Sequence, residues 1–302
     1  MPRLLPYLSV FLAFTAVATG EIRTGRSNDT FYEIAPSTET AGAAIQATTP
    51  VTAPPRSDAF LVDGERLRYL IKWTGLPAGE MIMEVHAKEE NGLQGFEITL
   101  KTRSSKALFF YSVHDEVSSF VEAGNFRASR FVKHIRQGRR VIDETSMMDY
   151  AKGEASFEQH NIGKKKEPER RTLKIAEPAL LDPLSVFFYL RAANLGSEKS
   201  EELHIFDRGK TYALSFAVLD DEALETDSFG ERPTLHIAPA AAFEGVLLSA
   251  GEVNMWLDKS TRIPLRIKIQ IPVGWAVADL VESNHPGLQP PAKEAKEGRR
   301  HR

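Results

Sequence analysis

The residues whose side chains could act in catalysis or metal binding are scattered along the sequence and form no recognisable motif. Eight histidines occur, and no two of them are four residues apart, so the sequence contains no helical zinc-binding pair. Gly209-Lys210-Thr211 imitates the end of a phosphate-binding loop, but His204 stands where that loop needs its first glycine. His114-Asp115 is the best acid–base fragment, and we interpret it as a polar pair on a half-exposed strand. The sequence therefore predicts no catalytic residue, no metal site and no cofactor.

Two arginines are better candidates for a role in ligand binding or in a buried ion pair. Arg191 shares the apolar stripe of a predicted helix, and Arg262 follows a strand turn just before Pro264. One hypothesis is that a guanidinium inside a curved sheet binds the carboxylate or phosphate of a ligand. The other, which we favour, is that a buried arginine pairs with an aspartate and locks the helix to the sheet. The aspartates considered for this pairing are Asp182, Asp258 and Asp279.

Aromatic side chains form the second candidate set. They either line an apolar cavity for an acyl chain or fill the core of a sheet packed against its helix. Sequence alone does not separate a filled barrel from a hollow one. The residues concerned are Trp73, Trp256, Trp275, Phe109, Phe110, Tyr111, Phe187 and Phe188.

A period of two in hydrophobicity predicts the strands that must position these residues. Apolar and charged residues alternate over 66–73, 80–88 and 96–101, and similar segments recur as far as 275–281. Asn91-Gly92 separates two of them and is a strong hairpin signal. Because no regular alternation of strands with helices occurs, we expect a mainly β fold with a large, strongly curved antiparallel sheet. Such a sheet forms an open or partly closed barrel.

A single main helix is expected after residue 182. Asp182 suits the N-cap, Pro183 the first helical position and Gly196 the end of the helix. Leu184, Phe187, Phe188 and Arg191 recur at helical spacing. The helix therefore should present an apolar, mostly aromatic face to the sheet.

The two ends of the chain differ from this central part. Arg3 precedes the apolar stretch 4–17, and Ala18-Thr19-Gly20 has the small residues that signal peptidase recognises. We predict a signal peptide over 1–20, a flexible Thr/Ala/Pro-rich tether over 21–57, one β-rich domain over 58–285 and a disordered charged tail over 286–302. The expected location is periplasmic or secreted, with no transmembrane span once the signal peptide is cleaved.

Composition narrows the classes of function. The formal net charge of −3 does not indicate a nucleic-acid-binding protein. The chain contains no cysteine, which excludes disulfides, thiolate metal sites and a cysteine nucleophile. A chain of 302 residues is long enough to bury a stable core without disulfides or bound metal ions.

Several segments, in this order and spacing, resemble a bacterial envelope family known as domain of unknown function 3108. The resemblance covers roughly Asp63 to Glu282. The segments are Gly64-Glu65-Arg66-Leu67-Arg68-Tyr69 with Trp73 and Gly79, Phe110-Tyr111-Ser112-Val113-His114-Asp115, Asp182-Pro183-Leu184-Ser185 with Tyr189-Leu190-Arg191, Trp256-Leu257-Asp258, Thr261-Arg262-Ile263-Pro264, and Gly274 to Leu280.

The resemblance implies an exported protein whose curved antiparallel sheet partly wraps a helix, similar to lipoprotein carriers. It supplies no catalytic residues. Our leading hypothesis is non-enzymatic binding of an apolar or amphipathic ligand, such as a lipid or the acyl chain of a lipoprotein. Its candidate binding residues are Arg191, Arg262, Trp73, Trp256, Trp275 and Phe187. The alternatives are a scaffolding protein that binds an envelope protein, and an unrecognised envelope hydrolase.

Overall fold

The computed structural model describes residues 60–105, 112–164, 167–193, 195, 202–239, 253–270 and 274–291. The predicted signal peptide (1–20) and tether (21–57) lie outside these residues, as do residues 292–302 of the predicted tail. None of the described helices is long and apolar enough to cross a membrane.

Strands make up most of the described chain, and one short α-helix, α2 (Ser185–Ala192), interrupts them. The mainly β fold with a large antiparallel sheet is therefore confirmed. The strands are β1 (Arg66–Trp73), β2 (Leu76–Glu90), β3 (Leu93–Ser104), β4 (His114–Glu122), β5 (Ala128–Gln137), β6 (Arg140–Asp149), β7 (Glu154–Asn161), β8 (Glu169–Lys174), β9 (Leu203–Asp207), β10 (Lys210–Leu214), β11 (Phe216–Thr226), β12 (Gly230–Pro239), β13 (Val253–Asp258), β14 (Pro264–Gln270) and β15 (Trp275–Ser283), with a 3-10 turn, η3 (Ile162–Lys164).

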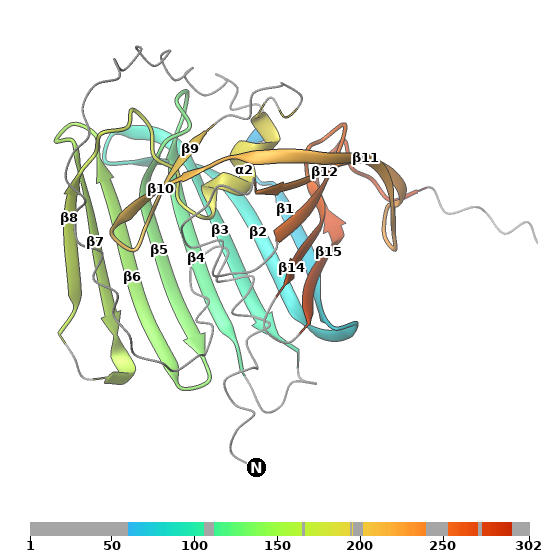
Figure 1. Ribbon diagram of the computed structural model, residues 1–302, viewed down its shortest axis with the longest axis horizontal. Helices are drawn as coiled ribbons and strands as arrows, with labels where there is room; N and C mark the ends of the chain where they lie inside the picture. The colour runs from blue at the N-terminus through green and yellow to red at the C-terminus, as the bar shows by residue number, and fades with distance from the viewer. Residues whose placement is uncertain are drawn as a thin grey trace, which may run out of the picture.

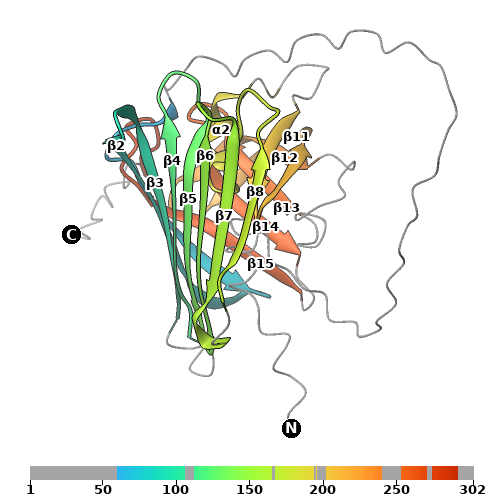
Figure 2. The same cartoon turned by 90° about the vertical axis from the view of Figure 1, so that its left-hand side faces the viewer.

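Thirteen strands form one sheet in the order β11-β12-β13-β14-β15-β1-β2-β3-β4-β5-β6-β7-β8, and all their pairings are antiparallel. β11 and β8 stand at opposite edges and are not paired with each other, so the sheet is open. Figures 1 and 2 show it strongly bent, with β2–β8 in one wall and β13–β15 in another. β9 and β10 form a separate hairpin in front of the sheet (Figure 1).

Local chemistry explains the tight turns. Asn91 and Gly92 both have positive φ, 54° and 80°, which is the backbone of the two-residue turn that favours this dipeptide. They join β2 to β3, whose register runs without a shift from Glu90↔Leu93 to Gly79↔Ser104. The hairpin predicted at Asn91-Gly92 is thus confirmed.

The core lies on the inner, concave face of the sheet. In β1, Leu67, Tyr69 and Ile71 are buried, whereas Arg66 and Arg68, which alternate with them, are partly exposed. Residues of β1–β5, β12–β15 and α2 belong to one apolar cluster, and Ala128, Met148, Ala155, Phe157, Leu180 and Phe206 form a second. In Figure 1, α2 and the β9–β10 hairpin lie across this face of the sheet.

The apolar core extends past the predicted domain end at 285. Leu288 is 0 % exposed and belongs to the larger core cluster. The amide of Gly287 donates to Nδ1 of His285, and Gln289 Nε2 donates to the carbonyl of His285. At least the first part of the segment predicted as a disordered tail therefore packs on the sheet.

Candidate functional site

The six predicted binding residues are not brought together. Trp73 packs against the inner apolar cluster and Phe187 is buried within it. Trp256 and Trp275 instead lie on the outer face, because they alternate with the buried core residues of β13 and β15. Of the other aromatic candidates, Phe188 is buried in the core and residues 109–111 lie outside the described part. These aromatic side chains therefore do not line one shared cavity.

The two outer tryptophans contact polar neighbours. Trp256 stacks on His236 with ring centroids 4.4 Å apart, and its Nε1 donates to Glu222 at 2.5 Å. The ammonium of Lys268 lies 4.1 Å from the ring centroid of Trp275. Both rings thus cover the outer surface of the sheet with their edges in polar surroundings.

Arg191 forms a buried ion pair, but with a residue other than the three aspartates predicted. Its two terminal nitrogens donate to the two carboxylate oxygens of Glu65 at 2.5 and 2.9 Å, and both side chains are 1 % exposed. Tyr69 lies nearby and donates to the carbonyl of Pro264, and burial raises its pKa. The pairing with Asp182, Asp258 or Asp279 was wrong because Glu65, just before β1, is the carboxylate that faces the end of α2. The guanidinium is therefore engaged in joining α2 to the sheet.

Arg262 occupies the turn between β13 and β14. Its φ of 57° lies in the left-handed region, and its amide donates to the carbonyl of Asp258 at 2.8 Å. Asp258 also accepts hydrogen bonds from Ser260 and Thr261 and pairs with Arg232 at 2.9 Å. The buried Nη1 of Arg262 has no hydrogen-bond partner among the described residues. The structure places this arginine in a tight turn and shows no ligand-binding cluster around it.

A buried charged cluster was missed by the sequence reasoning. Lys133 of β5 is 1 % exposed and lies 2.5 Å from Glu144 of β6 and 2.7 Å from Asp207 of β9. Burial alone would lower the pKa of Lys133, but the two carboxylates outweigh it and the pKa is raised. Burial raises the pKa of Glu144. A lysine held protonated between two acids is no nucleophile, and it ties the β9–β10 hairpin to the sheet.

Asp182 lies just before α2 in a fully buried position. One of its carboxylate oxygens accepts the amides of Leu184 and Ser185 at 2.8 and 2.9 Å, and the other accepts the hydroxyl of Ser119 at 2.5 Å. Burial raises its pKa from 3.8 to about 6, against the opposing effect of these hydrogen bonds. The predicted helix is present but shorter than expected: it begins at Ser185 with Leu184 at its N-cap and ends at Ala192, so Pro183 is not its first residue and it stops before Gly196. Asp182 nevertheless accepts two backbone amides at the start of the helix.

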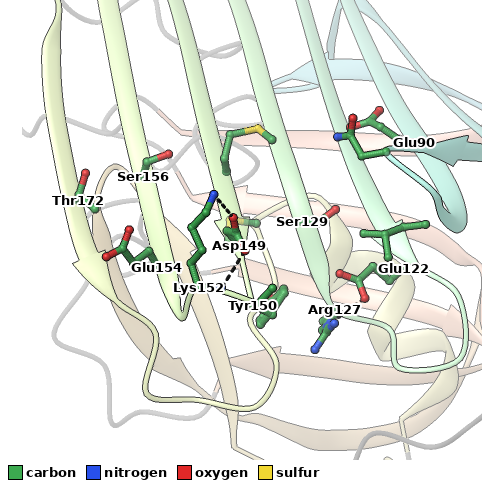
Figure 3. A pocket seen from close by; sticks show the side chains of 15 residues that line it. Glu90, Glu122, Arg127, Ser129, Asp149, Tyr150, Lys152, Glu154, Ser156 and Thr172 are labelled. Carbon is green, nitrogen blue, oxygen red and sulfur yellow. Dashed lines mark hydrogen bonds and ion pairs between the residues drawn. The ribbon is translucent and has the colours of Figure 1, made fainter.

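A hollow of about 550 Å³ in the described part of the chain opens on the outer face of the sheet (Figure 3). Three of its residues, Met147, Ser156 and Thr172, are cross-strand neighbours on β6, β7 and β8. They alternate with Met148, Ala155 and Leu173 of the second core cluster, which places them on the outer side. We call this cavity the outer hollow.

Three turns at one end of the sheet complete the outer hollow. They join β2 to β3, β4 to β5 and β6 to β7, which lie at the same end because the strands are antiparallel. The remaining lining residues are Glu90, Asn91, Leu93, Glu122, Arg127, Ser129, Met148, Asp149, Tyr150, Ala151, Lys152 and Glu154. Apolar, hydroxyl and charged groups thus share one cavity.

Ion pairs fix the charged rim of the outer hollow. Arg127 pairs with Glu122 at 2.7 Å and stacks over the ring of Tyr150 at 4.0 Å from its centroid. Lys152 pairs with Asp149 at 2.8 Å and lowers the pKa of that carboxyl (Figure 3). The first pair is mostly buried and the second exposed, so the Asp149–Lys152 pair is the freer of the two to rearrange around a ligand.

No group of three or more metal-ligating histidine or acidic side chains occurs within the described ranges. The fold and site define an open, curved antiparallel sheet with a mixed polar and apolar hollow on its outer face. The sequence profile of the family described as "Protein of unknown function (DUF3108)" matches residues 68–281. The chain therefore belongs to this family, as its sequence motifs indicated.

No curated protein matches the chain. Among solved structures, the chain is similar to the "Beta-barrel-like Protein of Domain of Unknown Function DUF1849 from Brucella abortus", with 14 % sequence identity and a TM-score of 0.49. That match covers 74 % of this chain and 98 % of the other.

Proposed function

We propose that this protein is an exported, non-enzymatic binding protein of the cell envelope, and that an amphipathic ligand occupies its outer hollow. The observation that carries the proposal is the hollow itself. Its volume of about 550 Å³ falls within the roughly 300–1,000 Å³ typical of small-molecule sites. Its lining offers Met147, Leu93 and Tyr150 for an apolar part, and Ser156 and Thr172 for polar groups.

The sequence led us to expect the ligand inside the curved sheet, whereas the proposed site lies on the outer face. A ligand inside the curved sheet would have to displace α2, whose residues from Ser185 to Arg191 are all buried. An anionic head group on Arg191 would have to compete with Glu65, which already accepts both terminal nitrogens. The outer hollow requires neither displacement. Each methylene buried there would contribute about 0.8 kcal/mol, so an acyl chain is a suitable apolar part.

Displacement of a fluorescent long-chain fatty acid by unlabelled lipids tests this binding. Ser156→Phe places a ring in the outer hollow, and Val281→Phe places the same ring on the outer face of β15, away from it. We expect saturable binding by the wild type and by the Val281 variant, and at least tenfold weaker binding by the Ser156 variant. Absent saturable binding, or equal binding by all three proteins, would refute the proposal.

Export is the second part of the proposal, and the apolar stretch 4–17 followed by Ala18-Thr19-Gly20 supports it. The test is N-terminal sequencing of the protein from fractionated cells. We expect a mature protein that starts at Glu21 in the periplasmic or secreted fraction. An intact Met1 in the membrane fraction would replace this reading with a membrane-anchored one.

A scaffolding role is the second candidate function, and the open sheet supports it. Among the strands that the structure describes, β8 and β11 each have a neighbour on one side only, so each carries backbone groups able to pair with an added strand. This candidate would lead if the outer hollow bound no ligand and an envelope protein bound to either edge.

A further inference from the structure

The edge strand β11 is unusual in composition and exposure. Residues 218–223 are all exposed, so this part of the strand is uncovered on both faces. It includes Val218 and Leu219, which are 39 % and 50 % exposed. β11 also carries four acidic residues and no basic one: Asp220, Asp221, Glu222 and Glu225. An open edge with exposed apolar side chains is an aggregation hazard unless something covers it.

The charge of β11 is only partly neutralised by its neighbours. Asp221 pairs with Lys259, and Glu222 accepts a hydrogen bond from Trp256. Neither contact involves the free edge, because Lys259 and Trp256 both belong to the side of β12 and β13. A basic segment of polypeptide is therefore the occupant that fits this edge.

The chain brings such a segment to one end of β11. Pro291 lies beside Gly230, where a Cβ added to the glycine would be 3.8 Å from the Cγ of Pro291. Gly230 is the β12 residue paired with Thr226, the last residue of β11. The backbone that follows Pro291 thus begins next to the end of the acidic strand.

Residues 292–302 are long enough to span β11 and carry the opposite net charge. They are Ala292-Lys293-Glu294-Ala295-Lys296-Glu297-Gly298-Arg299-Arg300-His301-Arg302, with five basic and two acidic side chains. Eleven residues in extended form reach about 36 Å, which is the length of the eleven-residue β11. A strand that starts at Thr226 and runs toward Phe216 is antiparallel to β11, as are all other neighbours in the sheet.

We propose that the basic segment 292–302 binds the open edge of β11 as an added antiparallel strand. It would pair the free backbone groups of the edge and cover Val218 and Leu219. With Ala295 opposite Ala223, Lys293 would face Glu225 and Lys296 would face Glu222, while Arg299 and Arg300 would lie diagonally across from Asp221 and Asp220. Because surface ion pairs are individually weak, the docking is reversible and sensitive to salt. This inference is independent of the outer hollow, whose lining residues come from β2–β8 and the turns between them, away from β11 in the strand order.

Disulfide trapping in the full chain tests the proposal, and the absence of native cysteines makes the result unambiguous. Ala223→Cys on β11 is combined with Ala292→Cys, Ala295→Cys or Gly298→Cys in the tail. Two cysteines are bridged only when their Cα atoms are within about 7 Å. With Pro291 beside Gly230, we expect Ala295→Cys to react fastest, in an intramolecular bond whose rate does not depend on protein concentration.

Controls separate docking from random collision. Ala295→Cys paired with Thr172→Cys on β8 should react at least tenfold more slowly. Reversing Asp220, Asp221 and Glu225 to lysine, with Ala223→Cys retained, should slow the tail reaction by a similar factor. These residues are exposed, so an unchanged melting temperature is expected and checks that the variant is folded. Equal rates for the β8 and β11 pairs, or a disulfide that forms only between two molecules, would overturn the proposal.

Discussion

Removing one partner of the Arg191–Glu65 pair should destabilise the protein strongly. Arg191→Met keeps the unbranched aliphatic part of the side chain but leaves the Glu65 carboxyl group, which is 1 % exposed, without its bidentate partner. An uncompensated buried charge costs roughly 3–5 kcal/mol. For a domain of this size, each kcal/mol shifts the melting temperature by about 2–4 °C, so we expect a fall of about 6–20 °C.

The double variant Arg191→Met with Glu65→Leu removes both charges and supplies apolar groups of similar volume. Replacing a buried pair in this way is often neutral or stabilising, so most of the lost stability should return. Urea unfolding of the wild type, both single variants and the double variant gives the coupling free energy directly. A single-variant loss below about 1 kcal/mol, or additive effects of the two changes, would show that the pair is not the buried lock between α2 and the sheet.

Three other predictions use the same unfolding assay. The raised pKa of Asp182, from 3.8 to about 6, stabilises the fold most below pH 3.8, and this contribution is lost as the pH rises through 6. A shift of this size corresponds to about 3 kcal/mol, so Asp182→Asn should flatten the stability profile between pH 4 and 7, and an unchanged slope would contradict the assignment. Leu288→Ala should lower the free energy of unfolding by about 2–5 kcal/mol, because Leu288 is fully buried. Gln289→Ala, at an exposed neighbouring position, should change it by no more than about 0.5 kcal/mol. Equal small effects would mean that residues after 285 do not support the core. Lys133→Met should lower the free energy of unfolding by about 3–5 kcal/mol at neutral pH. Part of this loss should be recovered on acidification, because the raised pKa of Glu144 favours its protonation. A loss that does not vary with pH would argue against the cluster.

The strands and the main hairpin could be predicted because their cause is local. Each strand has one face in the core, so a period of two is written into its sequence, as in Leu67, Tyr69 and Ile71. Asn91-Gly92 selects its turn through backbone conformations that few other dipeptides adopt. α2 was predicted from its cap and its apolar spacing for the same reason.

The orientation of the tryptophans carried a signal that the sequence reasoning left unused. In β13, Val253, Met255 and Leu257 share one parity, and Trp256 has the other. In β15, Ala276, Ala278 and Leu280 are buried while Trp275 alternates with them. Reading the parity of each tryptophan against its apolar neighbours would have placed both on the outer face. Residue type alone suggested a shared cavity.

The polar pairs could not be assigned because they depend on long-range packing. Arg191 and Glu65 are 126 positions apart, and Lys133 and Asp207 are 74 apart. Many carboxylates in the sequence satisfy the chemistry of either pairing, and only the path of the chain selects among them. Lys133 did show one local sign, because it shares the parity of Phe131 and Ile135 in a strand with a buried face.

The outer hollow likewise arises from the meeting of three separate turns. Glu90, Arg127 and Lys152 each look like ordinary turn or edge residues in the sequence. Their common position at one end of the sheet follows from the order of β2–β8, which sequence spacing does not fix. The cavity therefore depends on segments that are far apart in the sequence.

Native mass spectrometry of protein purified gently from its own cells shows whether the outer hollow holds a ligand. We predict that the wild type and the Val281→Phe control retain an added mass of a lipid or another amphipathic molecule. Ser156→Phe, in which the outer hollow is filled, should be recovered without it. Wild-type protein free of any added mass, or the same added mass on the Ser156 variant, would contradict the claim that the outer hollow is a binding site.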